Sequence, residues 1–124
     1  RSLQDYRGIA ANKGRGVFNG KAIVHAGAQK SNARQVNRNL LLTPGAEIDT
    51  KPELEIYADD VKCAHGCAVG ELDSAALFYM AQRGLSPETA KRLMLQAFVA
   101  EAFVGAADEE ALLDQAIAAL EAML

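Results

Sequence analysis

The stretch that limits the fold most runs from Asp49 to Gly70 and reads DTKPELEIYADDVKCAHGCAVG. Polar and apolar residues alternate in it from Glu53 to Ile56. A period of two is typical of an extended chain, because successive side chains of a strand point to opposite faces. Pro52 and Gly70 are of the types that commonly bound strands. We therefore expect one or two strands here, bounded by these two residues, and no helix.

The second half of this stretch places Cys63, His65 and Cys67 at every other position. In a strand their side chains leave the same face, about 6.6 Å apart along the backbone. One interpretation is packing, since free cysteines are often buried. The other is a site for a transition metal or iron–sulfur species, with His25 as the only further ligand elsewhere. Spacing alone favours packing, and Gly66 introduces the alternative of a bulge that turns Cys67 away.

The first 48 residues contain short extended runs separated by Gly and Asn. Runs of this kind are typical of solenoids, although no repeat of fixed length is evident and a small β-sandwich fits equally well. The segment Asn12–Gly16 is expected to be a tight corner, because it lacks the pattern of a phosphate-binding loop. The basic segment Lys30–Arg38 is expected to be a solvated loop or the outer face of a rung.

The period becomes helical after Gly70. Asp73 is expected to cap a helix over residues 74–82 that Gly84 closes. Ser86, followed by proline, starts a second helix that is expected to run as far as Gly105. Asp108 is the expected cap of a third. A β region followed by three amphipathic helices predicts the α+β class.

Composition narrows the function further. The 124 residues carry a net charge of −3, which argues against nucleic-acid binding. No apolar run approaches the roughly 20 residues of a membrane span. Two cysteines that are poorly placed to bridge each other, with no evident signal peptide, favour a reducing, cytoplasmic setting. The chain opens on Arg1 rather than Met, so a fragment of a longer protein is expected. No nucleophile–base set is visible, and the chain is not expected to be an enzyme.

Several motifs together resemble one known family. KPELEIYADDVKCAHG is followed by VG-x-LD and LFY-x3-RGL, and NKGRGVFNGKAIVHAGAQ and NRNLLLTPGAEIDT precede it in the same order as in that family. They resemble the C-terminal core of the SufB/SufD family, the scaffold subunits of the SUF machinery for iron–sulfur cluster assembly. The resemblance extends from about Tyr6 to at least Leu95, and the form D-D-V-K-C-x-H-G is closer to SufD-type than to SufB-type members.

The resemblance implies the C-terminal rungs of a right-handed parallel β-helix over residues 1–70 and a helical region over residues 71–124. It implies a SufB-like partner, with His65 and Cys63 at the subunit junction where a transient cluster assembles and no cofactor bound stably. Cys67 departs from the small residue expected there. The isolated chain is expected to self-associate. A SufC-like ABC-type ATPase would bind the region from Arg83 to Phe103, with candidate residues Arg83, Leu93, Met94, Phe98 and Phe103.

Two alternatives to this scaffold stay open. The first is a stand-alone metal or iron–sulfur carrier whose ligands are Cys63, His65 and Cys67. The second is a β-helix hydrolase fragment that uses paired carboxylates, for which the candidates are Glu53, Glu55, Asp59 and Asp60. Acidic residues on an outward strand face are more often simply solvated.

Overall fold

The computed structural model describes residues 1–124, which form two compact units, Arg1–Gly70 and Glu71–Leu124. The first unit contains five strands and the second three helices. The α+β class expected from the sequence is confirmed. The elements are β1 (Ser2–Ala10), β2 (Arg15–Val24), β3 (Asn32–Leu41), β4 (Glu47–Ile56), β5 (Lys62–Gly70), α1 (Ser74–Gln82), α2 (Pro87–Ala100) and α3 (Glu109–Met123). None of the helices is long and apolar enough to cross a membrane.

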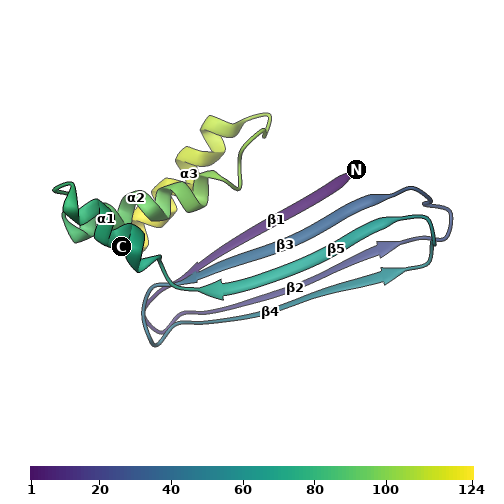
Figure 1. The fold of residues 1–124 in the computed structure, drawn as a ribbon, viewed down its shortest axis with the longest axis horizontal. Helices are drawn as coiled ribbons and strands as arrows, with labels where there is room; N and C mark the ends of the chain where they lie inside the picture. The colour runs from purple at the N-terminus through teal and green to yellow at the C-terminus, as the bar shows by residue number, and fades with distance from the viewer. The chain divides into compact units, whose positions relative to one another are not determined.

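The strands form two parallel sheets that the chain enters in turn (Figure 1). The first sheet has the order β1-β3-β5, and the second consists of β2 and β4. Ser2 pairs with Ala33, 31 residues later, and Asn32 pairs with Lys62, 30 residues later. The chain therefore returns to the same sheet at nearly constant intervals, a periodicity that the sequence alone did not reveal.

The stretch from Asp49 to Gly70 belongs to two strands that lie in different sheets. The expectation that Pro52 bounds a strand is wrong, because β4 continues through it from Glu47 to Ile56. Pro52 pairs with Gly20 of β2, and β4 has no neighbour on its other side. An edge strand tolerates proline because an amide that points away from the sheet is not needed for pairing.

The interior between the sheets is partly polar. Gln35, Asn37 and Asn39 of β3 are only 3%, 2% and 5% exposed. The Thr50 hydroxyl of β4 donates to Asn37 Oδ1 at 2.6 Å, which joins the two sheets through this row. The expectation that Lys30–Arg38 is a solvated loop or an outer face is therefore wrong for Gln35, Val36 and Asn37, which are buried, whereas Lys30, Asn32 and Arg34 are exposed. The side-chain nitrogen and oxygen of both Asn37 and Asn39 have hydrogen-bond partners, which compensates for their loss of water, whereas Gln35 has a partner for its nitrogen alone.

Close approach of the two sheets depends on small residues in this interior. Tyr6 of β1 and Phe18 of β2 are in ring contact across it, with centroids 5.0 Å apart. A Cβ on Gly20 would lie 2.7 Å from both Gln35 Oε1 and Phe18 Cζ. Glycine at position 20 therefore leaves room for the buried Gln35 amide.

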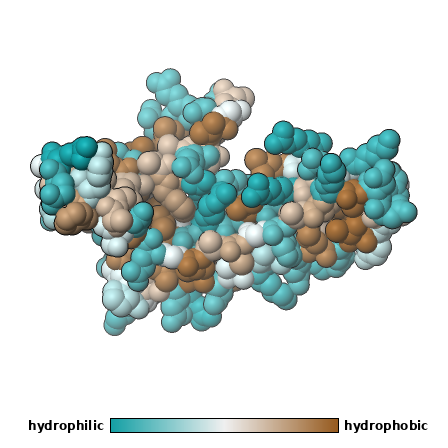
Figure 2. Space-filling model, viewed as in Figure 1, coloured by the Kyte–Doolittle hydropathy of each residue, from teal (hydrophilic) through white to brown (hydrophobic).

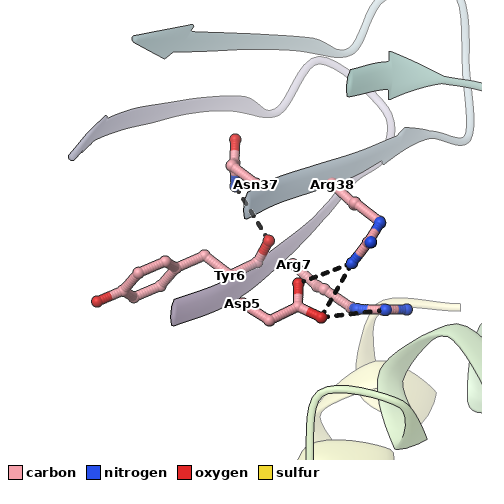
Figure 3. A network of polar contacts seen from close by, with 5 residues as sticks. All are labelled: Asp5, Tyr6, Arg7, Asn37 and Arg38. Atoms are coloured by element: carbon pink, nitrogen blue, oxygen red, sulfur yellow. Dashed lines mark hydrogen bonds and ion pairs between the residues drawn. The ribbon is translucent and has the colours of Figure 1, made fainter. Parts of the chain in front are cut away.

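The opposite face of the first sheet carries ion pairs. Arg38 Nη1 donates to both carboxylate oxygens of Asp5 at 3.0 and 3.1 Å, and Arg7 Nη2 lies 3.2 Å from the same carboxylate. Figure 3 shows these three side chains converging, while Asn37 points the other way and donates to the Tyr6 carbonyl. The alternation of strand side chains thus separates the buried amide row from a charged face.

The starts of the first two helices follow the sequence signals. The Asp73 carboxylate accepts from the amides of Ala75 and Ala76, so the expected cap of α1 is confirmed. Gly84, with φ of +86°, closes α1 as expected, because its amide donates to the Ala81 carbonyl in a left-handed C-terminal turn. The Ser86 hydroxyl accepts from the Thr89 amide at 3.2 Å, which confirms the start of α2.

Two helix expectations are wrong. The second helix ends at Ala100 and does not continue to Gly105, because the amides of Ala102 and Phe103 bond to carbonyls only three residues back. Phe103 therefore lies in a turn. Asp108 occupies the N-cap position of α3 but makes no side-chain cap bond. In this turn the Gly105 amide donates to Glu109 Oε2 at 2.9 Å.

Candidate functional site

The candidate site lies on β5, the last strand of the first sheet. Cys63, His65 and Cys67 occupy alternate positions of this strand, so the expected extended geometry is confirmed. They pair in unbroken register with Ala33, Gln35 and Asn37 of β3. The bulge considered at Gly66 is absent, because every residue of β5 has one partner on β3. The three side chains therefore continue the row that includes the buried amides of β3.

β5 is an edge strand of the first sheet, because it pairs with β3 on one side and has no neighbour on the other. Cys63 is half-buried, whereas His65 and Cys67 are exposed. Both cysteines are free thiols. The unpaired side of β5 exposes backbone amides and carbonyls, to which a strand of another protein can pair. Such a strand would lie beside the His65 imidazole and the Cys67 thiol.

The structure does not bring these residues together as a metal site. No group of three His, Cys, Asp or Glu side chains is placed to hold a metal ion. The reason is the strand itself: four residues of rise separate Cys63 from Cys67 by about 13 Å, whereas thiolate and imidazole ligands sit about 2.0 to 2.3 Å from one zinc ion. His25, which directly follows β2, does not complete such a group. A carrier that uses this chain's three residues alone therefore gains no support from the geometry.

Beside His65, on β3, lies a feature that the sequence did not predict. Gln4, Gln35 and His65 are in register across β1, β3 and β5. Gln35 Nε2 donates to Gln4 Oε1 at 2.8 Å, while the buried Gln35 Oε1 has no partner. The sequence carries little signal for this row, because Asn37, Arg38 and Asn39 are consecutive polar residues and show no alternation. A polar segment is expected at the surface, since a polar interior is uncommon.

The carboxylates considered for hydrolysis take part in surface ion pairs or lie in a corner. Lys21 Nζ lies 2.6 Å from Glu55 Oε1 and 3.9 Å from Glu53 Oε2. The hydrogen bond from Lys21 is the main cause that lowers the pKa of Glu55, and the same pair raises the pKa of Lys21. Asp59 and Asp60 lie between β4 and β5. A lowered pKa does not suit a general acid.

The helical unit carries the residues expected to bind an ATPase. Arg83 ends α1 and stacks on the Tyr79 ring, 3.8 Å from its centroid. Leu93 on α2 is 43% exposed. Met94 and Phe98 are half-buried on the same helix, and Phe103 is half-buried in the turn that follows it.

Two apolar residues outside the expected set are more exposed than Leu93. Phe78 on α1 is 67% exposed and Val104 is 73% exposed. Apolar side chains are visible at the surface of the helical part in Figure 2. α1 has no fully buried residue, and although Leu77 and Met80 of its apolar stripe are half-buried, Phe78 is exposed. Exposed apolar surface of this kind often marks an interaction site.

Comparison with known proteins places this geometry in a family. Residues 1–98 match the family model described as SUF system FeS cluster assembly, SufBD core domain. The chain is 45% identical over 108 residues to the iron-sulfur cluster assembly protein SufD of Escherichia coli, an alignment that covers 87% of this chain and 26% of that protein. It is 45% identical over 93 residues to Protein ABCI7, chloroplastic, of Arabidopsis thaliana, covering 75% of this chain and 20% of that protein. SufD of Bacillus subtilis is 38% identical over 93 residues, which cover 75% of this chain and 21% of that protein.

These alignments also set the scale of the likeness. The chain spans about a quarter or less of the length of the curated relatives it matches. The family match includes all five strands, the first helix and most of the second. The chain belongs to the SufBD core family of the SUF system for iron–sulfur cluster assembly, and within that family it is similar to SufD.

Proposed function

We propose that this chain is a non-catalytic, SufD-like scaffold subunit that presents the edge of β5 to a SufB-like partner. The observation that carries the proposal is an unpaired strand edge with an exposed His65 and a half-buried Cys63 on one row. An imidazole is a competent iron ligand, and a single ligand needs others from a second protein to hold a cluster. The cluster is thus the product under assembly, and the partner completes its ligand set.

We propose further that the first unit is part of a right-handed parallel β-helix. Support comes from two parallel sheets that the chain enters alternately, with about 31 residues between paired strands. In such a solenoid each coil contacts only its neighbours, and the last coil offers its edge to whatever follows. Pairing with a partner strand at β5 would extend the first sheet by one more strand.

Two free thiols on this strand suit the reducing cytoplasm, where they stay unoxidised.

The helical unit is proposed to bind a SufC-like ATPase through the region from Arg83 to Phe103. The support is the exposed apolar surface on α1 and α2, including Leu93. Exposed aromatic and aliphatic anchors on helices are the usual means of helix-in-groove binding. ATP-driven movement of the ATPase would then reach the strands through the chain that joins Gly70 to α1.

A reconstitution experiment tests the role of His65. The chain is co-expressed with a SufB-like and a SufC-like subunit, and cluster formation is followed by absorbance under anaerobic conditions with iron and sulfide. His65→Ala is expected to reduce cluster formation at least tenfold while leaving the complex intact. His25→Ala is the matched control, because it removes the only other histidine, which is also exposed. Normal cluster formation by His65→Ala would refute the proposed role.

A binding experiment tests the helical surface separately. Leu93→Asp is expected to abolish co-purification of the SufC-like ATPase. Leu112→Asp on α3 is its control, because Leu112 is 39% exposed but lies outside the proposed region. Equal loss of binding in both variants would show that the effect is not specific to α2.

Without its partner, the chain is proposed to self-associate. Both sheets end in unpaired strands, β1 and β5 in the first and β2 and β4 in the second. Such edges pair with other chains unless they are covered. Sedimentation velocity is expected to show species larger than the 13.2 kDa monomer, and monomeric behaviour at high concentration would refute this part of the proposal.

A further inference from the structure

In the buried side-chain amide of Gln35, the nitrogen makes a hydrogen bond and the oxygen makes none. It is 3% exposed and lies between Gln4 and His65 in the same register row. Its Nε2 donates to Gln4 Oε1 at 2.8 Å, whereas its Oε1 has no partner. A buried acceptor without a donor is destabilising, so a donor within reach of Oε1 would be strongly favoured.

The surroundings of Oε1 limit what that donor can be. Toward β1, Gln4 accepts from the Gln35 amide through its Oε1, and its own Nε2 makes no hydrogen bond to Gln35 Oε1. On β2, Gly20 has no side chain, and a Cβ there would lie 2.7 Å from Oε1. The ring of Phe18, beside Gly20, is apolar. On the remaining side, His65 is the residue of β5 in register with Gln35, and a neutral imidazole has one N–H to donate.

We propose that Gln35 is a positioning residue for His65: its Oε1 accepts a hydrogen bond from one imidazole nitrogen of His65. The spacing of the row allows such a bond, because the preceding pair, Gln35 and Gln4, makes one of the same kind at 2.8 Å. The bond fixes the tautomer of His65, so the second ring nitrogen keeps its lone pair. Hydrogen bonds of this sort orient histidine ligands in metal sites. That this lone pair binds iron rests on the function proposed above. The hydrogen bond between Gln35 and His65 does not depend on that function.

Nitrogen-15 NMR of the imidazoles tests the bond directly. The chain has two histidines, so each sample gives only two sets of ring signals, and exposed His25 serves as an internal reference. At about pH 8 an unperturbed histidine is neutral. His65 is expected to favour one tautomer by about tenfold, as a hydrogen bond of ordinary net strength gives. In Gln35→Met its nitrogen shifts should move to the values of His25.

Two further variants separate the bond from a general loss of packing. Gln35→Glu keeps an acceptor at the same position and is expected to restore the single tautomer. Thr50→Val removes a different interior hydrogen bond, the one to Asn37, and should leave His65 unchanged. If the His65 shifts are the same in Gln35→Met as in the natural sequence, the inference is wrong and another group satisfies Oε1.

The same variants distinguish this inference from the function on which it builds. Cluster formation by the co-expressed complex is measured for Gln35→Met and for Gln35→Glu. If the tautomer preference is lost but cluster formation is normal, the bond between Gln35 and His65 stands and the ligand role of His65 fails. If both are lost in Gln35→Met and both return in Gln35→Glu, the positioning role is supported.

Discussion

The buried Asn37 is the residue on which the strand unit should depend most. Its side-chain oxygen accepts from Asn39 Nδ2 and from Thr50 Oγ1, each at 2.6 Å, and its amide donates to the Tyr6 carbonyl at 3.2 Å. These bonds join β1, β3 and β4. Asn37→Ala removes these three hydrogen bonds and a longer fourth one, from Asn37 Nδ2 to Asn39 Oδ1 at 3.4 Å, and leaves polar groups of its neighbours without partners. At about 1 kcal/mol for each of the three shorter bonds, we expect the free energy of unfolding to fall by about 3 kcal/mol.

This loss is large for a unit of this size. Seventy residues at 0.05–0.15 kcal/mol each correspond to a total stability of about 4 to 10 kcal/mol. Thr50→Val removes only the bond to Asn37 and is expected to cost about 1 kcal/mol. The double variant should cost less than the sum of the two, by about 1 kcal/mol, because the single variants share that bond.

Urea unfolding followed through strand amide resonances measures these differences in the strand unit separately from the helices. We compare the urea midpoints of the natural sequence, the two single variants and the double variant. Differences in midpoint report differences in stability when the dependence of the unfolding free energy on urea concentration has the same slope in all four proteins. If Asn37→Ala costs no more than Thr50→Val, the polar interior does not support the fold. Strict additivity of the two changes would likewise contradict a shared bond.

Three further changes test other parts of the structure. Gly45→Ala places a Cβ 2.8 Å from the Asn12 carbonyl oxygen and should destabilise the strand unit by about 1 to 3 kcal/mol in urea unfolding. Ser86→Ala removes the cap of α2 and should cost about 1 kcal/mol, measured by thermal unfolding of helical circular dichroism. Lys21→Met should return the lowered pKa of Glu55 to its ordinary range in a carbon-13 NMR titration. A carboxyl group with a lowered pKa stabilises the fold only at pH values where it is ionised. The difference in unfolding free energy between the natural sequence and Lys21→Met should therefore be constant near neutral pH and shrink below about pH 4.3.

Each of these changes has a matched control. Gly27→Ala meets no atom within 4 Å and should be close to neutral, so a cost equal to that of Gly45→Ala would contradict the steric argument. Asp108→Ala should cost less than Ser86→Ala because Asp108 makes no cap bond. Lys51→Met leaves the contact between Lys21 and Glu55 intact, and a full return of the pKa of Glu55 in that variant would contradict the assigned cause.

Local signals in the sequence predicted the elements whose causes are local. The caps at Asp73 and Ser86 and the closing glycine of α1 are confirmed because each depends on residues within one turn. The strand that carries His65 is confirmed for the same reason, since alternation is visible within a few residues.

Features that depend on distant residues were not predictable in this way. Proline is compatible with β4 only because that strand lies at an edge, and edge position depends on the whole sheet. The polar residues Gln35 and Asn37 can be buried because Gln4, Tyr6 and Thr50 provide partners from other strands. The roles of Cys63 and His65 in cluster assembly remain predictions, because a second protein must supply the remaining ligands.

Hydrogen exchange at β5 tests the central claim most directly. The chain is mixed with a SufB-like subunit, and exchange of the backbone amides of β5 is compared with that of β1, the other edge of the same sheet. If β5 pairs with the partner, alternate amides on its unpaired side, from Lys62 to Gly70, should become protected while β1 stays unchanged. Protection of β1 instead of β5, or of neither strand, would contradict the account.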